Sequence, residues 1–179
     1  LDGTLIDSAP DIEHIAATVL ARRGREALTL VETRNFIGEG SAVFVQRMMA
    51  ARGIEETAER FASIHEEFLA QYQHSVDKAV FYPGVVNTLN ALMRDGHKLG
   101  LCTNKPQQAA RVVLRHMQLE ALFDAVIAGG MLASRKPEPD MLLRAIEALG
   151  GGPALYVGDS EIDAETARRA DVPFALYSQ

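Results

Sequence analysis

Four short polar segments of this 179-residue sequence carry side chains that could take part in catalysis. They are Leu1-Asp2-Gly3-Thr4-Leu5, Cys102-Thr103-Asn104-Lys105, Arg135-Lys136-Pro137 and Gly158-Asp159-Ser160. Each one is placed where a strand would end and a loop would begin. In an open parallel sheet, ligands bind beyond the carboxyl ends of the strands. The sequence therefore predicts that these four segments converge on one site.

Together these segments supply the groups that a transferring phosphoryl group requires. The set comprises the carboxylates Asp2, Asp159 and Asp163, the hydroxyl of Thr103, the amide of Asn104 and the ammonium of Lys136. Carboxylate and carbonyl oxygens with water suit a hard octahedral cation, which predicts a Mg²⁺ site. Hydroxyl, amide and ammonium donors neutralise the charge that spreads over phosphoryl oxygens. Taken alone, each segment is also typical of a turn or a helix start, so only the set supports a site.

The composition limits the kinds of partner. With 18 Lys and Arg against 24 Asp and Glu, the net charge of −6 argues against nucleic acid or an anionic membrane as the main partner. The single cysteine, Cys102, lies in an apolar run and leaves no disulfide framework, which favours a reducing cytosol. No apolar run approaches the length of a membrane span. We expect a cytoplasmic protein that binds a small molecule, and the sequence leaves the oligomeric state open.

Periodicity divides the chain into a helical part and an α/β part. From residue 8 to about residue 80, apolar residues recur at helical spacing, and no strand is predicted there. After that, short apolar runs alternate with amphipathic helices, which is typical of a parallel sheet covered on both faces. The expected strands are 99–102, 125–128, 155–157 and 174–177, and the expected helices are 85–94, 107–117, 140–149 and 161–170. This predicts a doubly wound, Rossmann-like α/β core (1–7 and 82–179) with an inserted all-helical domain (8–81).

In their order along the chain, the polar segments resemble the four motifs of the haloacid dehalogenase superfamily. The matching residues are Asp2-Gly3-Thr4-Leu5, Thr103-Asn104-Lys105, Lys136-Pro137, and Gly158-Asp159-Ser160 followed by Asp163. The helical insertion after the first motif is similar to the cap domain of that superfamily. Further segments most resemble the phosphoglycolate phosphatase-like subfamily: Asp7-Ser8-Ala9-Pro10-Asp11, Phe36-Ile37-Gly38-Glu39-Gly40, Arg47 and Tyr82-Pro83-Gly84.

The resemblance implies a role for each matching residue. Asp2 would protonate the leaving alkoxide and then deprotonate the attacking water, while its backbone carbonyl binds Mg²⁺. Asp159 would be a direct metal ligand. Asp163 would either bind the metal through water or orient Lys136. The residues implied to hold or neutralise the phosphoryl oxygens are Thr103, the backbone of Asn104, and Lys136.

The family motif reads Asp-x-Asp-Gly-Thr, and its first aspartate attacks phosphorus to form an aspartyl-phosphate. Asp2 matches the second aspartate. We therefore expect the nucleophile directly before Leu1, at the end of an apolar strand, in the full-length protein. The residue encoded at that position decides between an enzyme and a catalytically silent binding module, because any residue other than aspartate contradicts the enzyme hypothesis.

The implied activity is a Mg²⁺-dependent phosphatase acting on a small phosphomonoester, with 2-phosphoglycolate as the leading substrate. An acid at Asp2 favours phosphate esters over the dehalogenase and phosphonate chemistry of the same superfamily, which needs no protonated alkoxide. The alternatives are a sugar-phosphate mutase similar to β-phosphoglucomutase and the silent binding module. Candidate contacts for a substrate carboxylate are Gly40 and Ser41 at a helix start, with Arg47 adding positive charge.

Overall fold

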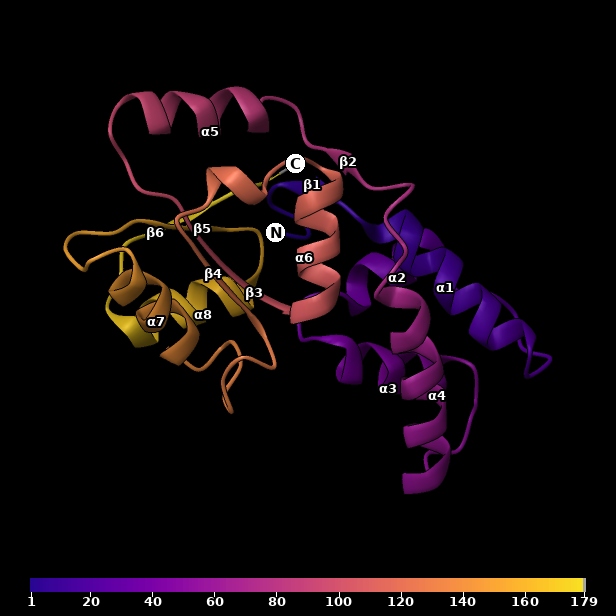
Figure 1. Cartoon of the computed structure of the whole chain (residues 1–179). Helices are drawn as coiled ribbons and strands as arrows, with labels where there is room; N and C mark the ends of the chain where they lie inside the picture. The colour runs from indigo at the N-terminus through magenta and orange to yellow at the C-terminus, as the bar shows by residue number, and fades with distance from the viewer. Residues whose placement is uncertain (179) are drawn as a thin grey trace.

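The computed structural model describes residues 1–178, and its first half is helical. The helices there are α1 (Ala9–Ala21), α2 (Leu30–Phe36), α3 (Ser41–Ala51) and α4 (Ala58–Tyr72), which gather on one side of the molecule (Figure 1). Local signals fix their starts. Pro10 lies in the first turn of α1, and Thr29 and Glu32 form a reciprocal capping box at α2. The hydroxyl of Thr57 caps α4.

These helices enclose an apolar cluster of their own. The cluster draws its buried residues from 12–72, with Ala109 as the one contribution from outside that range. Its centre is aromatic: the ring centroids of Phe44 and Phe68 are 5.2 Å apart, and those of Phe68 and Tyr72 are 5.3 Å apart. Such pairs stabilise a core beyond the burial of their area. The helical part can therefore hold its internal arrangement and present Tyr72 at a defined position.

The second half alternates strands and helices, as predicted. The strands are β3 (Gly100–Pro106), β4 (Ala125–Gly129), β5 (Tyr156–Gly158) and β6 (Phe174–Leu176). The helices are α5 (Val85–Arg94), α6 (Gln107–His116), α7 (Asp140–Ala148) and α8 (Glu161–Ala170), with a short 3₁₀ helix, η1 (Glu120–Leu122), before β4. The predicted α/β class is confirmed. Within residues 1–178, none of the helices is long and apolar enough to cross a membrane.

The parallel strands form two separate pairs. β3 pairs with β4 from Gly100 opposite Ala125, and β5 pairs with β6 from Tyr156 opposite Phe174. Among the described residues no hydrogen-bonded ladder joins the two pairs, so the single continuous sheet that we predicted is not observed. Paired neighbouring strands lie about 5 Å apart. Here β3 and β5 do not pair, and residues of both strands line one cavity of about 1160 Å³.

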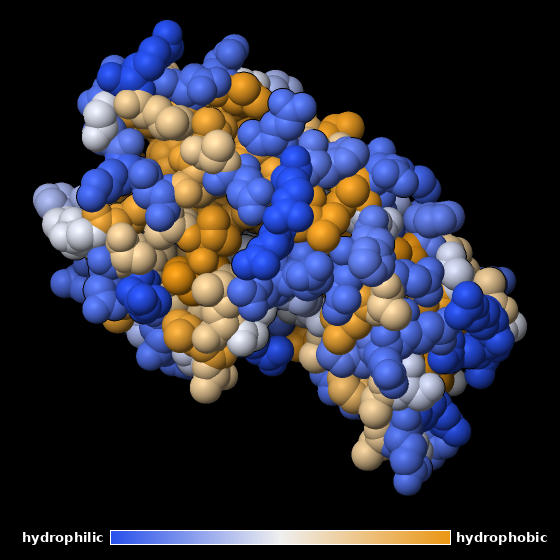
Figure 2. Space-filling view, in the orientation of Figure 1, coloured by the Kyte–Doolittle hydropathy of each residue, from blue (hydrophilic) through white to orange (hydrophobic). Residues whose placement is uncertain are grey.

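The half of the molecule that holds the strands exposes a band of apolar side chains (Figure 2). Strand β5 contributes to this exposure, since Val157 is 48% exposed and Leu155, just before the strand, is 62% exposed. Leu176 in β6 is 64% exposed. Apolar surface of this kind on a strand is typical of a face that can pack against another segment.

A small antiparallel ladder connects the two halves. In it, β1 (Ile6–Asp7) pairs with β2 (Val80–Phe81), with Ile6 opposite Phe81 and Asp7 opposite Val80. The prediction that no strand occurs up to residue 80 was wrong at Val80. The strand is only two residues long, and its pairing depends on a partner more than 70 residues away, so no local period indicates it. The ladder holds the two ends of the helical part side by side.

Candidate active site

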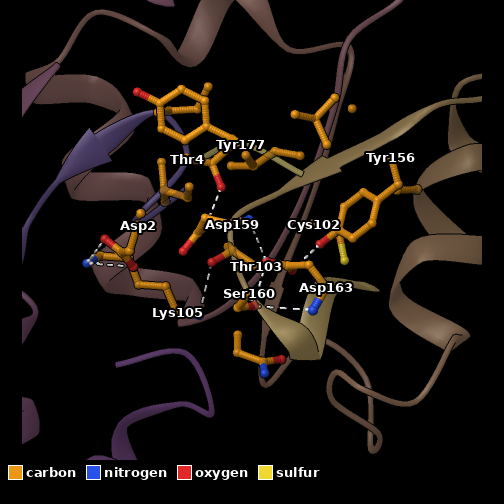
Figure 3. A pocket seen from close by; sticks show the side chains of 18 of the residues that line it. Asp2, Thr4, Cys102, Thr103, Lys105, Tyr156, Asp159, Ser160, Asp163 and Tyr177 are labelled. Atoms are coloured by element: carbon orange, nitrogen blue, oxygen red, sulfur yellow. Dashed lines mark hydrogen bonds and ion pairs between the residues drawn. The ribbon is translucent and has the colours of Figure 1, made fainter. Parts of the chain in front are cut away.

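The loop 1–6 presents Asp2 toward the end of β3 (Figure 3). Backbone hydrogen bonds from Gly3 N to Ile6 O (2.9 Å) and from Leu5 N to Leu1 O (2.9 Å) close the turn. The Oδ1 atom of Asp2 accepts hydrogen bonds from Lys105 Nζ (3.1 Å) and Ser8 Oγ (2.5 Å). Burial opposes ionisation of Asp2, but neighbouring positive charge, chiefly the Lys105 ammonium, and the Ser8 hydrogen bond together outweigh burial, so the pKa of Asp2 lies below its usual value. Asp2 is therefore held as a carboxylate.

The end of β3 carries three buried polar residues in succession. Thr103 is 4% exposed, and its Oγ1 accepts a hydrogen bond from Lys105 N (3.1 Å). The side chain of Asn104 joins two loops: its Nδ2 donates to Gly38 O and to Lys136 O, both at 3.1 Å, and its Oδ1 accepts from Lys136 N at 2.9 Å. The Asn104 side chain thus fixes the backbone of Lys136 and ties it to the loop before α3.

Lys136 is held by a buried carboxylate and a tyrosine. Its Nζ donates to Asp163 Oδ1 (2.6 Å) and Tyr156 OH (3.1 Å), and Tyr156 OH donates to the same Asp163 oxygen (2.7 Å). The other oxygen, Oδ2, accepts from Ser160 Oγ (2.8 Å) and Asp159 N (3.2 Å). Burial alone would raise the pKa of Asp163, but Lys136 outweighs it and lowers that pKa to about 2. Since both oxygens are occupied, this placement favours orienting Lys136 over binding a metal.

Asp159 presents a carboxylate that suits a divalent cation. Its Oδ1 accepts a hydrogen bond from Thr4 Oγ1 at 2.6 Å, and within residues 1–178 no basic side chain forms an ion pair with it. Burial and the neighbouring carboxylate of Asp163 raise the pKa of Asp159 above its usual value. A bound divalent cation would offset the free-energy cost of keeping Asp159 ionised. The described residues hold no group of three or more His, Cys, Asp or Glu side chains that could bind a metal, so the backbone carbonyl of Asp2 and water would complete the ligand set.

Gly3 allows the close approach of this loop to Asp159. Its φ of +83° lies in the left-handed region, and a Cβ at this position would fall 2.1 Å from Asp159 Oδ2. Side chains other than glycine would have to displace the carboxylate that we assign to the metal.

We expect Gly3→Ala to lower both the free energy of unfolding and the affinity for Mg²⁺, because the methyl group displaces Asp159. The matched control is Gly53→Ala, since Gly53 has a φ of +60° but nothing within 4 Å of the added methyl group. The loss of unfolding free energy at Gly3 should exceed that at Gly53 by at least about 1 kcal/mol. Urea unfolding and calorimetric Mg²⁺ titration measure both quantities, and equal losses at the two glycines would contradict the assignment.

The candidate substrate contacts divide into two groups. Gly40 and Ser41 line the same cavity as Asp2 and Lys136, and Ser41 Oγ forms a hydrogen bond with His65 Nε2 (3.0 Å). Arg47 is ion-paired with Glu39 and does not line that cavity. The structure therefore brings Gly40 and Ser41 to the site and directs the Arg47 guanidinium to a neighbouring carboxylate.

Sequence reasoning missed two residues in the cavity. The motif order gives Lys105 no role of its own, and Tyr72 belongs to the helical region 8–81, for which only a core or cap position was expected. Lys105 Nζ donates to Tyr72 OH at 2.8 Å as well as to Asp2. A lysine in an apolar strand that ends in polar residues was the available signal, because a buried ammonium requires partners.

The model of the haloacid dehalogenase-like hydrolase family matches residues 1–177. This chain belongs to that family. Within the haloacid dehalogenase-like hydrolases, it is 44% identical to a phosphoglycolate phosphatase of Cereibacter sphaeroides over 182 residues, which cover 100% of this chain and 83% of that protein.

Two further relatives among the haloacid dehalogenase-like hydrolases point the same way. Phosphoglycolate phosphatase 1 of Pseudomonas aeruginosa is 38% identical over 99% of this chain and 67% of its own length. The crystal structure of a predicted phosphoglycolate phosphatase from Haemophilus somnus 129PT matches with a TM-score of 0.89 at 28% identity, covering 97% of this chain and 80% of that one. The resemblance to the phosphoglycolate phosphatase-like subfamily is confirmed, and the chain is a phosphatase of this hydrolase family.

Proposed function

We propose that this protein is a Mg²⁺-dependent phosphatase that hydrolyses a small phosphomonoester, with 2-phosphoglycolate as the leading substrate. The observation that carries the proposal is the convergence of Asp2, Thr103, Lys136 and Asp159 on one cavity. Two carboxylates, a hydroxyl and an ammonium face the same space, which is the combination that a metal-bound phosphate group requires. The relatives named above support hydrolysis over phosphoryl transfer between sugar positions.

The residues of this chain divide the work among them. Asp159 and the backbone carbonyl of Asp2 would hold Mg²⁺, which when bound neutralises charge on the phosphoryl oxygens. Lys136, oriented by Asp163, would add a second positive charge beside the phosphoryl group. Thr103 and the backbone of Asn104 donate to the remaining oxygens. Negative charge on the phosphoryl oxygens is thereby neutralised from several sides.

Asp2 is proposed to be the general acid and then the general base of the reaction. The aspartate that the family motif places directly before Leu1 would attack phosphorus and form the aspartyl-phosphate as the bond from phosphorus to the alkoxide oxygen breaks. Asp2 in its protonated form would give its proton to that alkoxide, and the Asp2 carboxylate left behind would then take a proton from the water that hydrolyses the intermediate. The pKa of Asp2 lies below its usual value, because neighbouring positive charge, chiefly the Lys105 ammonium, outweighs the effect of burial. The carboxylate form favoured in this way is the form that accepts the proton from water.

We further propose that residues 8–81 act as the cap domain that selects the substrate. The part of the cavity formed by helices is lined by Phe44, Phe68 and Tyr72, together with Gly40 and Ser41. The amides at the start of α3 have no side-chain cap, because the N-cap residue is Gly40. They are placed to bind a substrate carboxylate, which supports a small acidic ester.

A phosphate-release screen of the full-length protein tests this function. The substrates are 2-phosphoglycolate, sugar phosphates, pyrophosphate and nucleotides, each with Mg²⁺. We expect the highest kcat/KM for 2-phosphoglycolate. Conversion of a sugar phosphate into its isomer without net phosphate release would instead support the mutase, and an absence of turnover for every ester would support the silent binding module.

The partner is a small phosphate ester rather than nucleic acid or a membrane surface, which the net charge of −6 supports. Cys102 is buried, and burial raises the pKa of its thiol. Both observations support the interpretation that Cys102 is an unreactive core residue of a protein in a reducing cytosol. Cytoplasmic location is tested by fractionating cells that express the tagged full-length protein.

A further inference from the structure

Lys105 occupies an unusual position between the helical part and the loop of Asp2. Its Nζ donates to Tyr72 OH at 2.8 Å and to Asp2 Oδ1 at 3.1 Å, and it lies 3.4 Å from Asp2 Oδ2. Tyr72 is the last residue of α4, whereas Asp2 belongs to the loop that leads into β1. One ammonium group therefore touches both halves of the molecule.

Burial makes these contacts obligatory. The side chain of Lys105 is 2% exposed and that of Asp2 is 11% exposed. An ammonium has three protons to donate, and in so buried a position it must find its acceptors within the protein. If Tyr72 OH moved away, the ammonium would have to reorient around its remaining acceptor, Asp2.

Tyr72 is itself fixed by the helical part. Its ring lies 5.3 Å from the ring of Phe68, inside the apolar cluster formed by α1, α3 and α4. The Lys105 ammonium also lies 4.3 Å from the Tyr72 ring centroid, which adds a cation–π contact. The packing of the helices thus sets the position of Tyr72, and Tyr72 sets one of the directions in which Lys105 donates.

We propose that Lys105 is a positioning residue for the Asp2 carboxylate and that Tyr72 acts through Lys105 to transmit the placement of the helical part to Asp2. This inference rests on the proposed acid and base role of Asp2. It assigns to the helical part a second task besides enclosing the substrate. The proton donor would be correctly aimed only when α4 holds Tyr72 against Lys105.

The leaving group offers a selective test. An alkyl ester such as 2-phosphoglycolate requires a proton on its leaving oxygen, whereas p-nitrophenolate leaves without one. kcat/KM covers the steps up to the first irreversible one, here the release of the alcohol. A residue that aims the proton donor should therefore affect kcat/KM for the alkyl ester alone. A residue that supports binding or folding should affect both esters alike.

We expect Lys105→Met in the full-length protein to lower kcat/KM for 2-phosphoglycolate by about 10- to 100-fold, part of the 10²- to 10⁴-fold effect typical of a positioned proton donor. Activity on p-nitrophenyl phosphate should stay within about threefold of the parent. Lys98→Met is the control for loss of a lysine charge, since Lys98 is exposed just before the start of β3, at the opposite end of that strand from Lys105, and donates to Leu149 O at 2.7 Å. This control should leave both activities unchanged.

Tyr72→Phe separates the hydrogen bond from packing, because it keeps the ring against Phe68 and Lys105. We expect a loss of about 3- to 10-fold on 2-phosphoglycolate alone, smaller than that of Lys105→Met, because Lys105 keeps its hydrogen bond to Asp2 when the Tyr72 hydroxyl is removed. The double variant Tyr72→Phe/Lys105→Met should match Lys105→Met, because the effect of Tyr72 passes through Lys105. If Lys105→Met does not fold, Tyr72→Phe still decides by its effect on the two esters.

Several outcomes would overturn the inference. Equal losses on both esters, multiplicative effects in the double variant, or unchanged kinetics for Lys105→Met would each contradict it. In these cases an active parent protein leaves the proposed function intact. A parent protein that hydrolyses neither ester overturns the proposed function, and the inference falls with it.

Discussion

Asp159→Asn abolishes Mg²⁺-dependent phosphate release from 2-phosphoglycolate and leaves the fold intact. The substitution removes the negative charge that a divalent cation requires, while the amide oxygen can still accept the hydrogen bond from Thr4. Within residues 1–178 no basic side chain forms an ion pair with Asp159, so loss of its charge breaks no ion pair. Steady-state kinetics over a Mg²⁺ titration measure the loss, and circular dichroism reports the fold.

A matched control for this substitution is Asp95→Asn. Asp95 is an exposed residue at the C-terminal end of α5, so its change should leave both the kinetics and the Mg²⁺ dependence as in the parent. Asp159→Asn turnover equal to that of the parent at saturating Mg²⁺ would refute the assignment of Asp159 as a metal ligand.

Asp2→Asn has the second large effect, a loss of about 10²- to 10⁴-fold in turnover of 2-phosphoglycolate. The amide can neither donate the proton to the leaving alkoxide nor accept one from water. Stability must be measured alongside, because Lys105 is buried and loses its anionic partner. The double variant Asp2→Asn/Lys105→Met removes both charges, so it should regain part of any lost unfolding free energy without regaining activity.

Turnover of Asp2→Asn within a few-fold of the parent would argue against the acid and base role. Recovery of activity in the charge-free double variant would instead assign the loss to the stranded Lys105 ammonium. The Asp2→Asn effect should also be larger than that of Lys105→Met, because Lys105 acts only through Asp2.

Local patterns predicted the fold where the signal lies within one element. The apolar run 125–128 became β4, and the helix expected at 85–94 is α5. The strand predicted at 99–102 extends to Pro106 because Thr103, Asn104 and Lys105 are buried by partners far away in sequence. Those polar residues resemble a loop when only their neighbours are considered.

The order of the motifs predicted which polar residues lie in the site, but not all of the contacts between them. The pairing of Asp163 with Lys136 was one of two alternatives, and the two side chains do form a buried ion pair. The contact of Lys105 with Asp2 spans 103 residues and that with Tyr72 spans 33, so no spacing rule could indicate them. No pattern in the sequence predicts that the guanidinium of Arg47 forms an ion pair with Glu39 instead of contacting a ligand.

Phosphate release from 2-phosphoglycolate by the full-length protein, measured before and after metal chelation, tests the proposed Mg²⁺-dependent phosphatase directly. From that function we expect rapid release with Mg²⁺, loss of release on addition of EDTA, and recovery when excess Mg²⁺ is restored. Release that continues unchanged in EDTA, or no release under any metal condition, would contradict it.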